Sequence, residues 1–277
     1  MDSLRRLADQ DMPFFLAVGF VKPHLPFTAP RDYWKLYERP EIELATHRKM
    51  PQGIPDLARH EWGELRKYSG IPAAPEAVAD ELARTLRHGY YASVSYVDAQ
   101  VGKVLDELAA LDLADETIVV LIGDHGWSLG EHGLWAKHSP FDVATRAPAI
   151  VRAPGQPKTG ISTGLVEFVD IYPTLAALLD ITPPEHLQGD SFVAQILDPD
   201  APGKAAVFPR WKTGEVIKTD SFSMTTWYDD AGEVRERMLF DHEGDRDETR
   251  NLVTDPDYAG VVRQLDAILS ESIQTRQ

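Results

Sequence analysis

The stretch that decides the fold is residues 117–126, which read Thr117-Ile118-Val119-Val120-Leu121-Ile122-Gly123-Asp124-His125-Gly126. A β-branched and aliphatic run of this kind is typical of a strand that is buried on both faces of a sheet. A glycine and polar residues then end the run. In open α/β sheets, ligands bind in the crevice beyond the carboxyl ends of the strands. The sequence therefore predicts an α/β domain with a candidate site directly after this strand.

A long helix precedes the strand. Apolar residues between Val78 and Leu111 recur about every 3.7 residues, close to the helical period, and no proline interrupts them. Gly89 is the position at which this helix could break. Two shorter apolar runs, residues 14–20 and 149–151, are predicted to be further core strands, and the first could lie parallel to the strand at 118–122.

The pattern of apolar and polar residues changes after about residue 200. Four runs alternate apolar and polar residues, and Asp229-Asp230-Ala231-Gly232 separates two of them as a hairpin turn. An amphipathic pattern over 258–273 follows. We therefore expect an α/β domain over residues 1–200 and a small α+β subdomain, with an antiparallel sheet and a terminal helix, over 201–277.

Composition excludes several classes of protein. The 277 residues carry a formal charge of −16, and so acidic a surface repels nucleic acids and anionic membranes. Cysteine is absent, which removes disulfides, zinc–thiolate sites and a cysteine nucleophile. No apolar run is long enough to span a membrane, and the first residues lack the apolar core of a signal peptide. Neither feature identifies a cellular location.

The densest polar cluster is residues 124–138, directly after the central strand. Asp124 and His125 offer an oxygen and a nitrogen to a divalent cation, and Lys137 offers a compact positive charge to an oxyanion. The alternative is a solvated turn with an Asx cap. His132 and His138, taken singly, are more typical of hydrogen-bonded or solvated histidines than of catalytic ones.

Two other polar stretches are weaker candidates. Lys22-Pro23-His24 follows the run at 14–20, and its lysine and histidine could bind an anion or protonate a leaving group. Residues 241–248 are rich in carboxylates, which could bind a metal but are more typical of a polar loop before the terminal helix.

These motifs together resemble a known family, the type I sulfatases, and within it the iduronate-2-sulfatase branch. The resemblance spans roughly residues 12–255 and is strongest from Asp124-His125-Gly126-Trp127 through Lys137 to Thr145. It is also carried by residues 14–27, by residues 90–102 and by the ending Leu239-Phe240-Asp241 with Asp245, Glu248 and Asn251-Leu252.

The resemblance implies an alkaline-phosphatase-like α/β sandwich with a smaller C-terminal antiparallel sheet. It also implies one divalent cation, usually calcium, and hydrolysis of sulfate esters. By resemblance Asp124 and His125 match metal ligands, while Lys137 and His24 match residues that contact the sulfate and assist the leaving oxygen. Lys22 and His138 are added as candidate substrate-binding residues beside them.

The sequence departs from the family where the nucleophile should be. The family uses a formylglycine made from a Cys/Ser-x-Pro-x-Arg motif, and no such motif stands in these 277 residues. The aspartate pair that should precede that motif is missing as well. The chain thus resembles the C-terminal part of a sulfatase, and we expect an incomplete sandwich that binds metal weakly and does not turn over substrate alone.

The expected partners follow from the same departure. They are a sulfated small molecule or sugar, and either an N-terminal sulfatase half or a second copy of the chain. Two alternatives of a different class stay open. One is a non-catalytic relic or interaction domain, and the other is a phosphodiesterase or phosphonate hydrolase of the same superfold. The sequence does not identify the sulfate ester.

Overall fold

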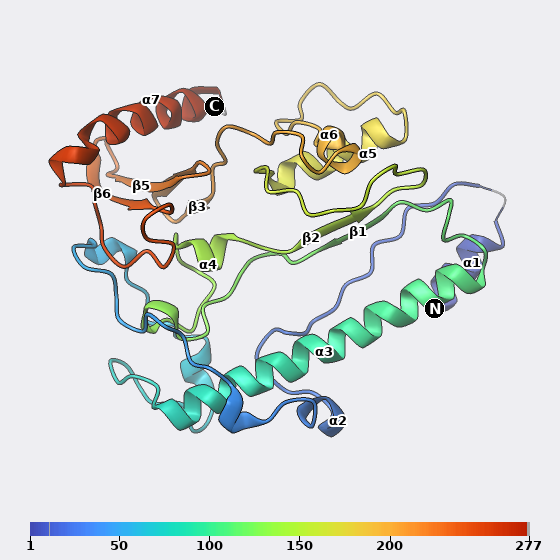
Figure 1. Ribbon diagram of the computed structural model, residues 1–277, viewed down its shortest axis with the longest axis horizontal. Helices are drawn as coiled ribbons and strands as arrows, with labels where there is room; N and C mark the ends of the chain where they lie inside the picture. The colour runs from blue at the N-terminus through green and yellow to red at the C-terminus, as the bar shows by residue number, and fades with distance from the viewer. Residues whose placement is uncertain (11, 276–277) are drawn as a thin grey trace. The chain divides into compact units, whose positions relative to one another are not determined.

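The computed structural model describes residues 1–10 and 12–275 of the chain, which form two compact units (Figure 1). The first, here called the helical unit, comprises Met1–Arg48, Glu61–Ile118 and Leu129–Trp135. The second, the sheet unit, comprises Lys49–His60, Val119–Ser128 and Ala136–Gln277. Each is described by itself.

The helical unit is built around one long helix. Its elements are α1 (Asp2–Ala8), α2 (Arg31–Trp34), η1 (Arg39–Glu41), η3 (Leu65–Lys67), α3 (Asp80–Ala110) and η4 (Glu131–Gly133). The 31-residue α3 confirms the predicted helix, and short helices within otherwise irregular chain over residues 28–75 confirm the irregular excursion that their prolines indicate.

Gly89 does not break α3, because its role is to allow close packing. A Cβ atom added at Gly89 would lie 2.7 Å from the carbonyl oxygen of Phe27 and 3.0 Å from the Trp34 ring. The neighbouring His88 is buried and its Nε2 lies 2.8 Å from the Trp34 carbonyl oxygen. The absent side chain thus lets the segment before α2 lie directly on the helix.

The sheet unit contains all the strands that the structure describes. Its elements are η2 (Asp56–Ala58), β1 (Val119–Ile122), α4 (Asp142–Thr145), β2 (Ala149–Arg152), η5 (Phe168–Asp170), α5 (Ile171–Leu178), α6 (Val193–Leu197), β3 (Arg210–Trp211), β4 (Gly214–Lys218), β5 (Phe222–Tyr228), β6 (Val234–Asp241), η6 (Pro256–Tyr258) and α7 (Ala259–Thr275). The predicted antiparallel sheet, its hairpin turn at 229–232 and the helices near 168–179 and 258–273 are all confirmed.

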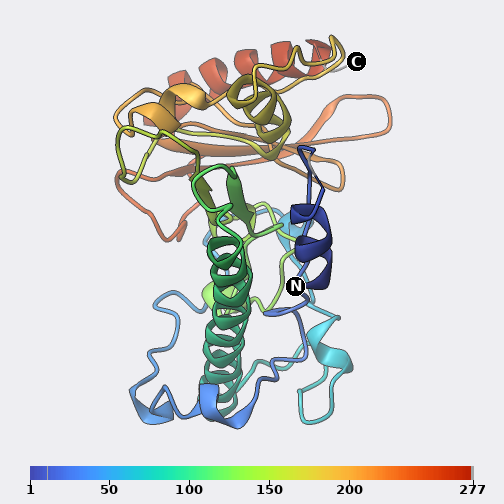
Figure 2. The same cartoon turned by 90° about the vertical axis from the view of Figure 1, so that its right-hand side faces the viewer.

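The C-terminal sheet has the order β3-β4-β5-β6, with every neighbouring pair antiparallel. One face packs against α7, which lies along the sheet in both ribbon views (Figures 1 and 2). The core between them consists of Ala206, Ile217, Met224, Leu239, Leu252, Leu265 and Leu269, all buried. Alternation along each strand and an apolar stripe on α7 together produce this layer.

The opposite face of the same sheet packs against the segment that follows Lys137. Lys218 lies on this face, one residue out of register with the core position Ile217, and its Nζ lies 2.8 Å from Oδ1 of Asp142 in α4. The Phe240 ring lies 6.0 Å from the fully buried Phe141 ring. The C-terminal sheet is therefore covered on both faces.

The strand predicted at residues 118–122 forms a smaller sheet than expected. β1 pairs only with β2 among the described residues, and the pairing is antiparallel, with Leu121 opposite Ile150. Both strands remain partly accessible, and Ile122 and Ile150 are 45% and 63% exposed. The predictions of burial on both faces and of a parallel neighbour were wrong, because a two-stranded ladder has no further strand to pair with and no layer on each face.

The run at 14–20 was also predicted incorrectly as a buried strand. Its residues carry no helix or strand assignment, and the Phe15 side chain is 83% exposed. Strand propensity alone does not create a strand, because the backbone needs a partner to complete its hydrogen bonds. The segment has the composition of a core strand without the neighbours that would make it one.

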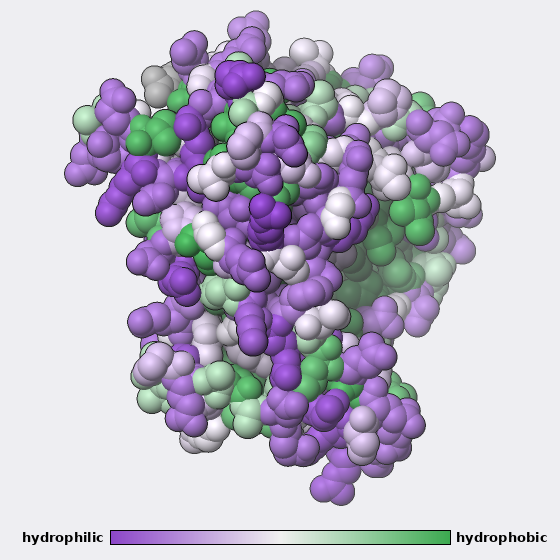
Figure 3. Space-filling view, turned by 60° about the vertical axis from the view of Figure 1, so that its left-hand side comes forward, coloured by the Kyte–Doolittle hydropathy of each residue, from purple (hydrophilic) through white to green (hydrophobic). Residues whose placement is uncertain are grey.

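One face of the molecule is mainly hydrophilic (Figure 3). Hydrophilic residues cover most of the face in Figure 3, with hydrophobic residues gathered in smaller patches. Among the described residues, no helix combines the length and apolar character that a bilayer crossing needs.

The division of the chain into two domains at residue 200 stays a prediction.

Candidate functional site

Asp124 and His125 lie just beyond the end of β1, as predicted, and their side chains approach each other. His125 Nδ1 donates to the Gly126 carbonyl oxygen at 2.7 Å, which leaves Nε2 as the nitrogen available to a ligand. This Nε2 lies 3.5 Å from Oδ2 of Asp124. Two donors at this separation can contact one cation, so the local geometry fits a pair of metal ligands.

The pair is not a complete metal site. Among the described residues, no cluster of three or more histidine, aspartate or glutamate side chains is arranged to hold a metal ion. The Asp124 side chain is 89% exposed. Calcium prefers about six to eight oxygen ligands, so the donors present do not fit a bound calcium ion by themselves.

Trp127 is a neighbour of both His125 and Lys137. A backbone hydrogen bond of 2.9 Å from Ser128 to the Ala136 carbonyl oxygen holds the two ends of the loop together. As a result, Lys137 Nζ lies 5.5 Å from the centre of the Trp127 ring, and the His125 ring lies 6.3 Å from it. Cation–π attraction to a largely buried indole restricts where the ammonium can lie.

Sequence reasoning overlooked Trp127 although it stands inside the strongest motif. Its signal was a large aromatic residue directly after a glycine turn, which could as well have been core packing.

His138 has different neighbours from Lys137. Its ring lies 6.0 Å from that of His60, and the His60 ring lies 6.1 Å from that of Trp211. His60 lay in a stretch without readable periodicity and gave no signal.

The Lys22–His24 turn belongs to the helical unit and is fixed by its own backbone. Both X-Pro bonds of the turn are cis, and Lys22 Nζ donates to the carbonyl oxygens of His24, at 3.2 Å, and of Pro26. Burial lowers the pKa of the Lys22 ammonium. The Lys22 ammonium is therefore hydrogen-bonded within its own turn, whereas the sequence predicted that it binds a substrate anion.

Glu64 is a partner of His24 that the sequence did not reveal. Its Oε1 lies 3.1 Å from His24 Nε2, while His24 Nδ1 lies 2.9 Å from the Leu25 carbonyl oxygen. Both ring nitrogens of His24 thus face an acceptor oxygen. No pattern could have linked these residues, because forty positions of irregular chain separate them.

The candidate residues fall into two groups. Asp124, His125, Lys137 and His138 belong to the sheet unit, and Lys22 and His24 belong to the helical unit. The structure pairs Asp124 with His125, and it places His125 and Lys137 each next to Trp127. Convergence of the two groups on one pocket stays a prediction.

The acidic stretch at 241–248 is a structural loop. Oδ1 of Asp241 accepts from the backbone of Glu243 at 2.9 Å, and Oδ2 of Asp245 accepts from the backbone of Thr249 at 2.6 Å. Glu248 is buried and hydrogen-bonded. Asp241 and Asp245 satisfy the loop's own donors and Glu248 accepts from the backbone of Asp142, which favours the polar-loop interpretation over a metal site.

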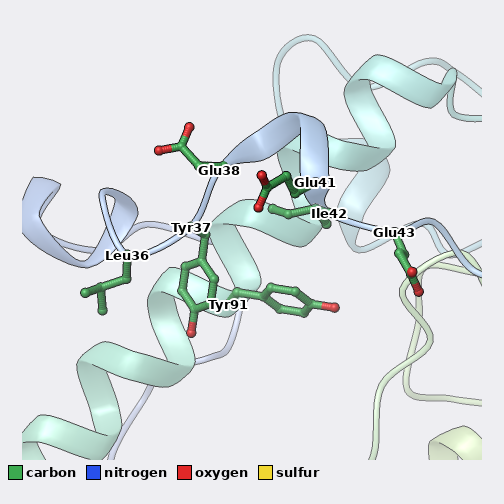
Figure 4. A pocket seen from close by; sticks show the side chains of 7 residues that line it. All are labelled: Leu36, Tyr37, Glu38, Glu41, Ile42, Glu43 and Tyr91. Atoms are coloured by element: carbon green, nitrogen blue, oxygen red, sulfur yellow. The ribbon is translucent and has the colours of Figure 1, made fainter.

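A shallow pocket in the helical unit is unrelated to these groups. It has a volume of about 330 Å³, and Figure 4 shows the rings of Tyr37 and Tyr91 side by side within it. The remaining lining residues are Leu36, Glu38, Glu41, Ile42 and Glu43. Three carboxylates repel a sulfate or phosphate group, so this pocket is not an oxyanion site.

Known protein families match both parts of the chain. The family model described as sulfatase matches residues 1–181, and the model of the N-sulphoglucosamine sulphohydrolase C-terminal region matches residues 130–275. Human iduronate 2-sulfatase is 38% identical over 225 residues, which are 70% of this chain and 40% of that protein. An arylsulfatase of Clostridium perfringens is 26% identical over 100% of this chain and 56% of its own length.

Solved structures agree on the fold. The phosphonate monoester hydrolase of Agrobacterium radiobacter superposes with a TM-score of 0.78 at 25% identity, over 99% of this chain and 59% of that one. An enzyme in complex with its substrate D-glucosamine-2-N,6-O-disulfate superposes with a TM-score of 0.66 at 25% identity, over 77% of this chain and 45% of its own.

The architecture is thus the expected incomplete alkaline-phosphatase-like sandwich, and the chain spans about half the length of the relatives it matches. The sulfatase model covers well over half of the chain, and the residues that it matches include Asp124, His125, Trp127 and Lys137. The chain belongs to the sulfatase family.

Proposed function

We propose that this chain forms the C-terminal part of a metal-assisted sulfate ester hydrolase of the iduronate-2-sulfatase type. The observation that supports this most is that Asp124 and His125 form a pair just beyond β1, and that His125 and Lys137 lie 6.3 Å and 5.5 Å from the centre of the Trp127 ring. Cation ligands next to a fixed ammonium are what a sulfuryl group needs around its oxygens.

In this proposal Lys137 stabilises charge on the bridging oxygen of the ester as the S–O bond breaks. Trp127 restricts the ammonium to one side of the site, which reduces the entropy that must be lost when the substrate binds. His138 and Lys22 assist binding of the anion. Asp124 and His125 contribute two ligands to a divalent cation, calcium in the first instance, which supplies Lewis-acid polarisation when it is bound.

His24 is proposed to supply the proton to the leaving oxygen. Its contact with Glu64, 3.1 Å from Nε2, supports this role because the carboxylate orients the imidazole ring. A protonated His24 next to the ester would both attract the sulfate and serve as general acid. The role requires that the turn at 22–24 faces Lys137 in the working enzyme.

The nucleophile has to come from outside the 277 residues. Sulfatases in general use formylglycine, and this sequence contains neither cysteine nor a Ser-x-Pro-x-Arg motif. We propose that an N-terminal sulfatase half supplies it together with further metal ligands, and that self-association is the second possibility. By itself the chain binds calcium weakly, at about the millimolar level, and does not turn over substrate.

A sulfated sugar is the proposed substrate class. This assignment rests on human iduronate 2-sulfatase and on the relative whose substrate is D-glucosamine-2-N,6-O-disulfate. The similarity to a phosphonate monoester hydrolase keeps one alternative substrate class open, a phosphonate or phosphate ester.

The proposal is tested first by ligand binding to the chain alone. We expect calcium and sulfate to shift the indole N–H resonance of Trp127 in NMR spectra, with the sulfate effect lost in Lys137→Ala. Lys35→Ala, at an exposed lysine paired with Asp32, is the matched control. A Trp127 resonance that responds to neither ligand would support the non-catalytic relic instead.

Activity provides the second test. The chain alone should not hydrolyse aryl sulfates, and turnover that tracks the protein and disappears in His24→Ala would contradict the proposed division of the site. When the chain is combined with a polypeptide carrying the nucleophile motif, sulfate esters should be cleaved. Preference for phosphonate esters in that assay would favour the alternative.

A further inference from the structure

A buried ionic cluster joins the C-terminal sheet to the segment that carries the candidate site. Its members, all in the sheet unit, are Asp142 and Thr145 of α4, Lys218 of β4, and His242 and Glu248 after β6. Glu248 is 2% exposed, and the Lys218 side chain is 8% exposed. Charged groups this deep are retained only with partners, because an unpaired buried charge is strongly destabilising.

Glu248 uses both carboxylate oxygens. Oε2 accepts from the backbone N–H of Asp142, the first residue of α4, at 2.9 Å, and Oε1 lies 3.0 Å from His242 Nε2. Lys218 Nζ completes the cluster by donating to Asp142 Oδ1 at 2.8 Å and to Thr145 Oγ1 at 2.5 Å. Side chains from two parts of the C-terminal sheet region thus fix the first and last residues of one short helix.

The backbone at Glu248 indicates that its position is imposed by these contacts. Its φ angle is +50°, in the left-handed region that residues other than glycine, asparagine and aspartate seldom adopt. A residue keeps such a conformation when its surroundings over-determine it. A loop with no further role could use glycine at this position, without a buried carboxylate.

The helix that the cluster holds is in direct contact with the candidate site. The backbone N–H of Gly126 donates to the Ala144 carbonyl oxygen at 2.9 Å. A Cβ atom at Gly126 would lie 2.1 Å from the Val143 carbonyl oxygen, so the turn carrying Asp124 and His125 rests on α4 with no space between. Any shift of α4 is therefore passed on to this turn.

We propose that Glu248 is a positioning residue, which holds α4 through Asp142 and thereby holds the Gly126 turn with its candidate metal ligands. His242 and Lys218 are its supporting partners. The importance of this arrangement for catalysis rests on the proposed function. The mechanical link itself does not, and it can be measured without substrate or metal.

Amide hydrogen exchange on the full chain, followed by mass spectrometry, tests the link. In Glu248→Ala we expect exchange in peptides covering 123–128 and 139–146 to accelerate by about tenfold or more, because a buried acceptor is lost from the start of α4. Glu248→Gln should restore nearly native exchange, since its amide can still accept from Asp142 and donate to a neutral His242.

Asp245→Ala is the matched control in the same loop. Asp245 caps Thr249 and has no hydrogen bond to α4, so its loss should accelerate exchange only around 241–252. If Glu248→Ala gives that same local pattern, with 123–128 unchanged, the proposal is wrong. It is equally wrong if Glu248→Gln accelerates exchange in 123–128 as much as the alanine variant does.

Should Glu248→Ala fail to fold, His242→Phe provides the same comparison with a smaller change. It removes one of the two partners of Glu248 and should accelerate exchange in 123–128 and 139–146 severalfold, and unchanged exchange there would overturn the proposal. Exchange in α3 serves as the internal reference. Because no sulfate ester is involved, absence of sulfatase activity after the chain is combined with a polypeptide carrying the nucleophile motif would contradict the proposed function and leave this result standing.

Discussion

The C-terminal sheet and the β1–β2 ladder are both antiparallel and apolar, but only the sheet is covered on both faces. In the sheet, Leu239 and Met224 are completely buried under α7, while Phe240 meets Phe141 on the other side. In the ladder, Ile150 is 63% exposed on a strand of four residues. Equal strand propensity thus leads to unequal burial.

The difference shows which of the two sheets is covered by segments of this chain. The sheet region supplies four strands, a helix for one face and the α4 segment for the other, all from contiguous sequence after residue 136. The ladder has the composition of a central strand pair but no further strand on either edge among the described residues. Apolar strands with open edges are normally paired or covered, which agrees with the proposal that another polypeptide segment completes this sheet.

The largest effect should come from the covered sheet. Leu239→Ala removes a fully buried side chain from the core under α7 and should lower the free energy of unfolding by about 3–4 kcal/mol. Urea denaturation measures this loss. Leu197→Ala, at a leucine that is 46% exposed in α6, is the matched control and should cost well under half as much. Equal losses would remove the contrast between covered and uncovered regions.

The turn at Gly126 should be nearly as sensitive. Gly126→Ala places a methyl group 2.1 Å from the Val143 carbonyl oxygen, so α4 or the turn must move, at a cost of about 2–3 kcal/mol. Gly260→Ala in α7 meets nothing within 4 Å and should be neutral or slightly stabilising. A thermally stable Gly126→Ala protein would show that α4 and the turn are not in rigid contact.

Acid should weaken the link between α4 and the sheet. Burial would raise the pKa of Asp142, but the charge and hydrogen bond of Lys218, with help from His242 and Arg146, hold that pKa below its ordinary value. A carboxyl of this kind stabilises the fold above the unfolded-state pKa of about 3.9 and loses that contribution as the pH falls through the lower folded value.

The measurement for this pH effect is the urea midpoint between pH 7 and pH 2. The difference between the native protein and Asp142→Asn should be constant above about pH 5 and shrink below pH 4. Lys218→Met should flatten the same acid limb. A difference that grows as the pH falls would reverse the sign of the pKa shift.

The smallest effect is expected in the ladder. Ile150→Thr keeps the β-branched shape and changes an exposed position, so the free energy of unfolding should change by no more than about 0.5 kcal/mol. A loss comparable to that of Leu239→Ala would show that this face is buried in solution. If a second polypeptide completes the sheet, the same variant should weaken that association.

Local pattern was sufficient wherever a segment finds its partners nearby in the sequence. The period between Val78 and Leu111 predicted α3, and alternation after residue 200 predicted the antiparallel sheet and its helix. The placement of Asp124 and His125 after a strand was also correct. The same reasoning failed for residues 14–20 and for the burial of β1, because neighbours that no local pattern reveals decide whether an apolar run becomes a buried strand.

Some residues of the candidate site could be predicted from the sequence, and others became visible only in the structure. Sequence identified Asp124, His125 and Lys137 because strand ends and residue chemistry are local properties. It did not identify Glu64, the partner of His24, nor the function of Glu248, since each contacts a residue forty or more positions away in the sequence.

The sequence by itself determined the family, the helices, the C-terminal sheet and the chemistry of the motif after β1, because periodicity and motif spacing are written along the chain. Only the tertiary structure decided that Trp127 lies next to both His125 and Lys137, and that a buried carboxylate from the C-terminal motif holds the helix behind them. The physical reason is that burial and hydrogen bonding depend on which distant segments meet. A carboxylate such as that of Glu248 looks like a surface residue until the fold encloses it.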